Sequence, residues 1–289
     1  MLLNASGCLD ALTAWETARS LDAFVTKTVT PLPRGGNPPV RIAETDVGML
    51  NSIGLANPGR ERFLAEILPR LRQLEIPLWV SVGGFSAQEY ADTCALLEDV
   101  TVELNLSCPN VDEAPESAAE IVAACRAATT LPLYAKLSPS AWNIGDVARA
   151  VEAAGADGLA LVNTMRGMAL DTELRPVLST KTGGLSGPAL KPVALAAVHA
   201  CFRATSLPIV GMGGVSSGRD ALELLAAGAE AVAIGTVLFS DPFAPARIRQ
   251  ELYAELATLG LASTAEACGI AHGEAFPDRK HLDVGSRVN

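Results

Sequence analysis

Residues 102–111 read V-E-L-N-L-S-C-P-N-V, and this stretch decides the fold class. Its first half alternates apolar and polar residues, which is typical of a strand. Pro109 ends the strand, because proline has no N–H to donate to a ladder. The polar residues that follow lie at the strand's carboxyl end, where a barrel of parallel strands carries its chemistry. From this stretch alone, Cys108 fits two interpretations: a base beside carboxamides, or a small buried apolar side chain.

Short apolar segments of this kind recur along the whole chain and alternate with amphipathic ones. Eight such segments predict strands at 1–6, 24–29, 78–82, 102–107, 133–137, 158–163, 209–213 and 231–236. The amphipathic segments predict helices at 9–20, 60–74, 87–97, 117–128, 144–154, 188–205, 218–227 and 243–259. Strand–helix alternation predicts a parallel sheet, and eight units predict a closed (β/α)8 TIM barrel. We therefore expect one α/β domain over 1–275 and a loosely ordered polar tail over 276–289.

One connection is longer than the others. Between the second strand and the helix that begins near Arg60 lie about thirty residues rich in Pro, Gly and Asn. Loops of this length in a compact domain are usually functional. The run M-L-N-S-I-G-L at 49–55 is too apolar to lie free in water. We expect this long loop after strand 2 to cover the carboxyl-terminal mouth of the barrel.

Charge and cysteine usage restrict the class of function. The chain of 289 residues has 22 Lys plus Arg against 32 Asp plus Glu, a net charge of −10. This balance disfavours nucleic acid or an anionic membrane as the main partner. A membrane span needs about 18 or more consecutive apolar residues, and none is present, nor is a signal peptide, so we expect a cytoplasmic protein. Six unpatterned cysteines and three scattered histidines predict no disulfide and no metal site.

The polar residues at the predicted strand ends point to an anionic ligand. Lys27 and Lys136 fall at the ends of the second and fifth strands, where a buried ammonium is costly without a negative partner. Glycines at 213–214 and 235 follow the seventh and eighth strands, the usual phosphate site of such barrels. The run T-G-G-L-S-G-P at 182–188 either completes that cradle or caps the next helix.

Several long motifs together resemble one family. N-L-S-C-P-N-V, M-L-N-S-I-G-L-A-N-P-G, A-K-L-S-P, N-T-M-R-G-M, T-G-G-L-S-G-P-A-L-K-P-V-A-L and G-M-G-G-V occur in order between about residue 4 and residue 243. They resemble dihydroorotate dehydrogenase of class 1, and most closely its NAD-linked subgroup, 1B. The resemblance implies an FMN-containing oxidoreductase barrel that oxidises (S)-dihydroorotate to orotate in pyrimidine biosynthesis.

The resemblance also implies a role for individual residues. Cys108 matches the base that takes the C5 proton of dihydroorotate, and a thiol whose pKa is lowered by nearby cations suits that task. The residues that match substrate contacts are Lys27, Asn51, Ile53, Gly54, Leu55, Asn105, Asn110, Asn163 and Thr164. Those that match flavin and phosphate contacts are Ala5, Ser6, Gly7, Lys27, Thr28, Asn105, Lys136, Val162, Ser186, Gly187, Gly213, Gly214, Gly235 and Thr236.

Three departures from the family pattern stand out. The segment 111–117 after Asn110 is shorter than the family's glycine-rich lid, which excludes water when closed. Ser81 replaces a common Asn beside the flavin, with the loss of one donor. The first strand begins almost at Met1, so the hairpin that often closes the bottom of the barrel is expected to be missing.

The resemblance implies that the electrons leave this protein through a partner subunit. The chain has no iron–sulfur ligand pattern and no G-x-G-x-x-G fingerprint, so it is not expected to reduce NAD alone. The 1B resemblance implies a second subunit with FAD and an iron–sulfur cluster, in a heterotetramer. A homodimer of the fumarate-using subgroup remains the alternative.

Three other functions compete with this one. A related flavin-dependent dihydropyrimidine oxidoreductase would keep Cys108 but change the carboxylate-binding turn at 51–55, which is intact here. A tRNA dihydrouridine synthase would need a basic surface, which the net charge of −10 opposes. A non-catalytic flavin- or ligand-binding barrel is the alternative outside the enzymes.

Overall fold

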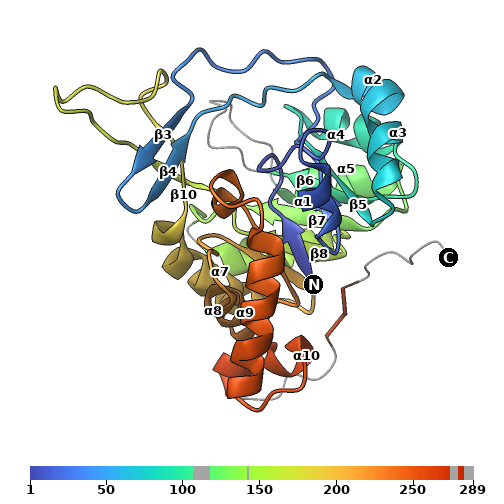
Figure 1. Cartoon of the computed structure of the whole chain (residues 1–289). Coiled ribbons are helices and arrows are strands. Elements are labelled where there is room, and N and C mark those ends of the chain that lie inside the picture. The colour runs from blue at the N-terminus through green and yellow to red at the C-terminus, as the bar shows by residue number, and fades with distance from the viewer. Residues whose placement is uncertain (107–117, 142, 274–278, 283–289) are drawn as a thin grey trace.

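The computed structural model describes residues 1–106, 118–141, 143–273 and 279–282, and its centre is a sheet of eight parallel strands (Figure 1). The strands are β1 (Leu2–Asn4), β2 (Phe24–Val25), β5 (Leu78–Val82), β6 (Thr101–Asn105), β7 (Leu133–Leu137), β8 (Gly158–Leu161), β11 (Ile209–Met212) and β12 (Ala231–Ile234). Their spatial order is β1-β12-β11-β8-β7-β6-β5-β2. A parallel bridge between Leu3 and Ala23 joins the two end strands. The predicted (β/α)8 barrel and its eight strands are confirmed.

Helices surround this barrel. They are α1 (Trp15–Arg19), α2 (Arg60–Arg62), α3 (Leu68–Leu71), α4 (Ala87–Cys94), α5 (Ala118–Ala128), α6 (Ile144–Ala153), α7 (Lys191–Ala204), α8 (Gly218–Ala226), α9 (Ala244–Thr258) and α10 (Thr264–Ala267). One π-helical turn, Phe63–Ile67, joins α2 to α3. Three of these helices begin at side-chain caps, since Ser86, Asn143 and Ser217 accept hydrogen bonds from the first turns of α4, α6 and α8. No helix within the described ranges is both long enough and apolar enough to cross a bilayer.

The core has two layers because side chains alternate along each strand. The larger layer packs the outer face of the sheet against the helices. The inner layer fills the barrel, where the rings of Trp79 and Tyr134 lie 4.4 Å apart. Gly158 makes room for that pair, because a Cβ there would lie 2.1 Å from the Tyr134 ring. The barrel interior is therefore a packed core, and any ligand must bind at one end.

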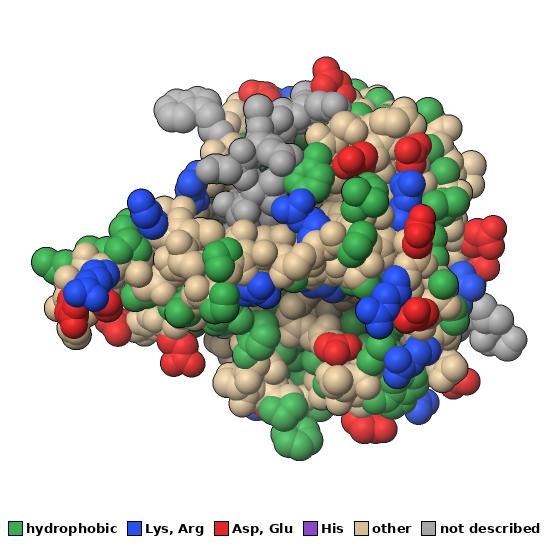
Figure 2. Space-filling model, turned by 90° about the horizontal axis from the view of Figure 1, so that it is seen from above, with side chains coloured by type: hydrophobic (Ala, Val, Ile, Leu, Met, Phe, Trp, Pro, Cys, Tyr) green, Lys and Arg blue, Asp and Glu red, His purple; other side chains and the backbone are tan. Residues whose placement is uncertain are grey.

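A second, antiparallel sheet projects beside the mouth of the barrel. It contains β3 (Ile42–Thr45), β4 (Gly48–Asn51), β9 (Met165–Gly167) and β10 (Gly183–Ser186), in the order β3-β4-β10-β9. The long segment after β2 was expected to be a loop; part of it forms this sheet instead. Figure 2 shows the sheet as an arm that projects to the left and carries hydrophobic side chains. Those exposed here are Val40, Ile42, Val47, Met168, Leu170 and Leu174.

The described part of the carboxyl-terminal tail, residues 279–282, is held against the amino end of the barrel. Arg279 donates hydrogen bonds to the carbonyls of Phe202, Thr205 and Leu207 at 2.6–2.8 Å, and its guanidinium lies 3.7 Å above the Phe202 ring. Leu282 packs against the inner core layer. We call residues 279–282 the strap. The strap lies within the tail over 276–289 that is predicted to be loosely ordered, and the sequence pattern does not show the contacts that the strap makes.

Replacing Arg279 by alanine is expected to lower the free energy of unfolding by about 2 kcal/mol, because three carbonyls lose a charged donor and the ring loses its cation. Arg279→Lys should recover only part of this, since one ammonium does not reproduce the planar fork. Urea denaturation measures both. Arg62→Ala, which removes an exposed pair with Glu66, is the control and should change little. An Arg279→Ala variant as stable as the parent would contradict this role of the strap.

Candidate functional site

A cavity of about 500 Å³ opens at the carboxyl ends of the barrel strands, bordered on one side by the arm sheet. This volume lies within the range of small-molecule and cofactor sites. Most residues singled out from the sequence line it: Ala5, Ser6, Gly7, Lys27, Thr28, Asn51, Ile53, Leu55, Asn105, Lys136, Val162, Asn163, Thr164, Ser186, Gly187, Gly213, Gly214, Gly235 and Thr236.

Three of the singled-out residues need separate mention. Gly54 lies behind the lining, with φ +73°, and a Cβ there would lie 2.6 Å from the backbone nitrogen of Asn37. A glycine is required at that position because most side chains disfavour this backbone conformation and the space is filled. Cys108 and Asn110 lie outside the described residues, as does the shortened segment 111–117.

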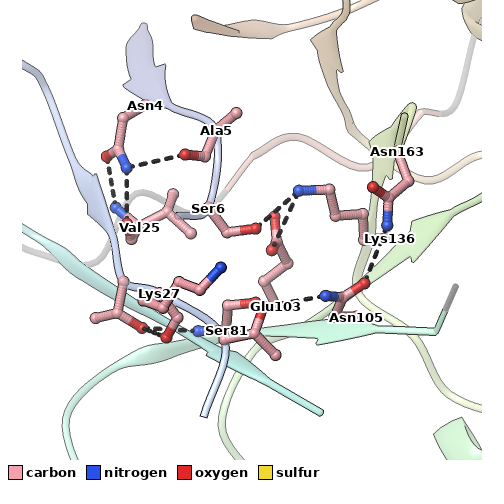
Figure 3. Close-up of polar contacts among 12 residues, drawn as sticks. Asn4, Ala5, Ser6, Val25, Lys27, Ser81, Glu103, Asn105, Lys136 and Asn163 are labelled. Carbon is pink, nitrogen blue, oxygen red and sulfur yellow. Dashed lines mark hydrogen bonds and ion pairs between the residues drawn. The ribbon is translucent and has the colours of Figure 1, made fainter. Parts of the chain in front are cut away.

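A row of hydrogen bonds crosses the floor of the cavity (Figure 3). The N–H of Thr164 donates to Asn163 Oδ1 at 2.8 Å, and Asn163 Nδ2 donates to Asn105 Oδ1 at 3.1 Å. Asn105 Nδ2 then donates to the Thr28 hydroxyl at 3.0 Å, which lies 3.0 Å from the Ser81 hydroxyl. A backbone N–H can only donate, so it fixes the orientation of both carboxamides. The row therefore presents a defined pattern of donors and acceptors to a planar ligand.

Two lysines bring positive charge to the cavity. The Lys136 ammonium donates to Ser6 Oγ at 2.9 Å and lies 3.5 Å from a carboxylate oxygen of Glu103. The Lys27 side chain lies against Gly7, where a Cβ would be 2.9 Å from its Nζ. Gly7 has φ +77°, so glycine both permits the turn and leaves room for the ammonium. The cavity can therefore hold a ligand with negative or electron-rich groups.

A glycine turn at the end of β11 offers backbone donors. Gly213 and Gly214 have φ +124° and +76°, and α8 begins a few residues later behind a capping box of Ser217 and Asp220. Asp220 accepts hydrogen bonds from Ser216 and Ser217 and pairs with Lys191 at 2.6 Å. Bare N–H groups next to a helix N-terminus favour a phosphate. This glycine turn, which we call the cradle, can therefore hold an anionic group.

We expect Gly214→Ala to weaken binding of a mononucleotide and to cost about 1–3 kcal/mol of stability. The reason is that a methyl group at this positive φ would lie 2.6 Å from Lys191 Cβ and 2.8 Å from its nitrogen. FMN affinity and the urea midpoint measure the two effects. Gly35→Ala is the control, because nothing lies within 4 Å of a Cβ there. Equal FMN affinity in Gly214→Ala and the parent would rule out the cradle.

Several lining residues escaped the sequence reasoning. Among them are Cys8, Met49, Ser216 and Phe239. Cys8 lies in the turn that follows β1, and its place near a strand end is a signal that the sequence offers. Burial raises the pKa of its thiol, although Lys136 and Lys27 oppose this. Met49 belongs to the arm sheet, whose pairing was not predicted, so no signal placed it at the cavity.

The fold and the cavity together define a (β/α)8 barrel with a site at its mouth that offers oriented amides, two lysines and a glycine turn. The dihydroorotate dehydrogenase family model matches residues 1–256. The chain belongs to the dihydroorotate dehydrogenase family, which comprises flavin-dependent oxidoreductases.

Individual relatives support this assignment. The catalytic subunit of dihydroorotate dehydrogenase B (NAD(+)) from Listeria monocytogenes serotype 4a is 44% identical over 280 residues, which cover 92% of each chain. The corresponding subunit from a Geobacillus species is 42% identical over 93% of this chain and 90% of its own. A crystal structure of the Eimeria tenella enzyme with ferulenol matches with a TM-score of 0.79 over 94% of this chain and 85% of its own. At 23% identity, that last match supports the fold alone.

Proposed function

We propose that this protein oxidises (S)-dihydroorotate to orotate in pyrimidine biosynthesis, with FMN as its cofactor. The observation that carries the proposal is one cavity that joins an oriented carboxamide row, two lysines and a glycine cradle. Dihydroorotate is a small ring with amide groups and one carboxylate, so it needs such donors and acceptors beside positive charge. Membership of the family supports the same reaction.

The cavity fits FMN at both ends of that molecule. The cradle at Gly213 and Gly214 suits the phosphate, and Gly235 and Thr236 from the next strand border the same region. Thr236 Oγ1 donates to Ser186 Oγ at 2.9 Å, which joins two of the proposed flavin contacts. Lys136 supplies positive charge for the ring, and Ala5 and its neighbours border the same space. When bound, FMN would supply the acceptor for the hydride that leaves C6 of the substrate.

The substrate is proposed to lie over the carboxamide row. Asn105 and Asn163 offer their amides to the ring, while Asn51 and Thr164 border the same space. Asn51 Nδ2 donates to the carbonyl of Gly184 at 3.2 Å, which fixes it to the arm sheet. The turn at 53–55 and Lys27 serve the carboxylate. Asn110 is proposed to complete this set.

Cys108 is proposed as the base that removes the C5 proton. A thiol becomes a competent base when positive charge lowers its pKa toward neutrality. Lys27 and Lys136 bring that charge to the same cavity. The proton passes to the Cys108 sulfur as the hydride leaves C6, so the ring gains a double bond.

Electrons are proposed to leave through a partner. The relatives from Listeria and Geobacillus are named as catalytic subunits of an NAD(+)-linked enzyme. Within the described residues no three His, Cys, Asp or Glu side chains are grouped to hold a metal. A second subunit with FAD and an iron–sulfur cluster would supply the path to NAD, in a heterotetramer built on the catalytic barrel at 1–275.

Anaerobic mixing of the yellow holoprotein with (S)-dihydroorotate tests the proposal. Loss of flavin absorbance, with formation of orotate in equal amount, is the expected result. Dihydrouracil in parallel distinguishes a related dihydropyrimidine oxidoreductase, since it lacks the carboxylate that Lys27 and the turn at 53–55 are proposed to bind. Bleaching by dihydrouracil alone would transfer the assignment to that reaction. A protein that stays yellow with both, or that cannot be loaded with FMN, would refute it.

A further inference from the structure

One buried acidic residue next to the cavity has no part in the proposed function. Glu103 lies on β6 and is 1% exposed. Its Oε1 atom lies 3.5 Å from Lys136 Nζ but accepts no hydrogen bond from the described part of the chain. Burying a carboxylate without saturating it costs free energy. We therefore ask what effect the Glu103 carboxylate has on its neighbour, Lys136.

The Lys136 ammonium faces two different surroundings, the cavity and the buried Glu103 carboxylate. Lys136 belongs to the cavity lining, whereas Glu103 does not. Figure 3 shows the ammonium in contact with both the Ser6 hydroxyl and the Glu103 carboxylate. The 3.5 Å separation from the carboxylate exceeds the 2.7–2.9 Å of a charge-assisted hydrogen bond. The carboxylate therefore acts on Lys136 mainly through its charge, and leaves the ammonium able to interact with a ligand.

The low exposure of this pair makes the charge effective. The side chains of Lys136 and Glu103 are 6% and 2% exposed, so water screens them poorly. Cys8 lies on the cavity wall, and burial is the main cause that raises the pKa of its thiol; beyond burial, the charge of Lys136 lowers that pKa and the charge of Glu103 raises it. A group on the cavity side of Lys136 therefore meets an ammonium whose field is partly cancelled from behind.

We infer that Glu103 is a positioning residue that limits how strongly Lys136 stabilises negative charge on the bound flavin. This inference rests on the proposed function. Reduced flavin carries more negative charge than oxidised flavin, so an ammonium beside the ring favours reduction. The carboxylate behind that ammonium opposes it and keeps the flavin potential lower. The reduced cofactor then passes its electrons on more readily.

The test is the midpoint potential of bound FMN, measured anaerobically against a reference dye. Glu103→Gln keeps the shape and removes the charge, and we expect the reduction equilibrium to move about tenfold toward reduced flavin, which is about 30 mV for a two-electron couple. Glu103→Asp keeps the charge but withdraws it by one methylene, and should shift the potential upward by less. The control is Glu152→Gln, which should not shift the midpoint potential. In the parent, the Glu152 carboxylate accepts hydrogen bonds from Ser206 near the strap.

A midpoint potential that rises from the parent to Glu103→Asp and again to Glu103→Gln supports the inference. A merely structural role predicts that the isosteric Gln variant has the parental potential, and that result would overturn it, as would a lower potential. If Glu103→Gln fails to fold, Glu103→Asp decides by an upward shift or none. A parent protein that binds no flavin overturns both this inference and the proposed function, whereas an unchanged potential in a flavin-loaded variant overturns this inference alone.

Discussion

Replacing Cys108 by alanine is expected to lower kcat for dihydroorotate oxidation by about 10²–10⁴-fold, the usual contribution of a positioned general base. FMN content and substrate affinity should stay close to parental values, because the proposed role of the thiol is proton removal and not binding. Anaerobic stopped-flow measurement of flavin bleaching reads the chemical step without the electron acceptor. Flavin absorbance before mixing reports cofactor content in the same experiment.

A second thiol makes this prediction sharper. Cys8 lines the cavity as well, but burial raises the pKa of its thiol, which makes it a poor base near neutral pH. Cys8→Ala should therefore bleach at a rate much nearer that of the parent, and Cys268→Ala, far along the chain beside α10, serves as a remote control. If Cys8→Ala loses turnover while Cys108→Ala keeps it, the base has been assigned to the wrong cysteine.

Replacing Asp220 by asparagine is expected to lower the free energy of unfolding at pH 7 by about 2–3 kcal/mol. Burial alone would raise the pKa of this carboxyl, but hydrogen bonds from Lys191, Ser216 and Ser217 outweigh it and lower the pKa to about 2 from 3.8. A lowered pKa in the folded state means that the contribution is present above pH 3.8 and is lost as the pH falls toward 2. Urea denaturation from pH 7 to pH 2 follows it.

The consequence for the cradle is measured separately. Asp220 anchors the backbone of Ser216 and Ser217 directly after the glycine turn, so FMN affinity should fall about tenfold in Asp220→Asn. The matched control is Asp146→Asn, which occupies the same position in the first turn of α6 but is 61% exposed. Its effect on stability should be small. An Asp220→Asn variant whose stability keeps the parental dependence on pH would contradict the role given to this carboxylate.

The barrel was predictable because its signals are local. Each strand is a short apolar run with a helix next to it, and the polar residues at strand ends, such as Lys27 and Asn105, fall at one face by topology alone. The arm sheet was not predictable in this way. Its strands Ile42–Thr45 and Gly48–Asn51 carry mixed side chains, and β4 pairs with β10 more than 130 residues later.

Two further features could not be predicted from the sequence, and the reason is physical. Glu103 alternates with apolar residues in β6, and this pattern alone does not show that the closed barrel buries the carboxylate. Arg279 has no periodic signal at all, because its three partners are backbone carbonyls that the sequence does not distinguish. Periodicity identifies layers and not single buried charges, which depend on geometry between distant segments.

The strap separates two properties that are often linked in enzymes. It lies at the amino end of the strands, while the cavity lies at the carboxyl end. Changes around Arg279 should therefore alter how long the folded protein survives on heating without altering how fast it turns over. That makes the strap a place to engineer shelf life independently of rate.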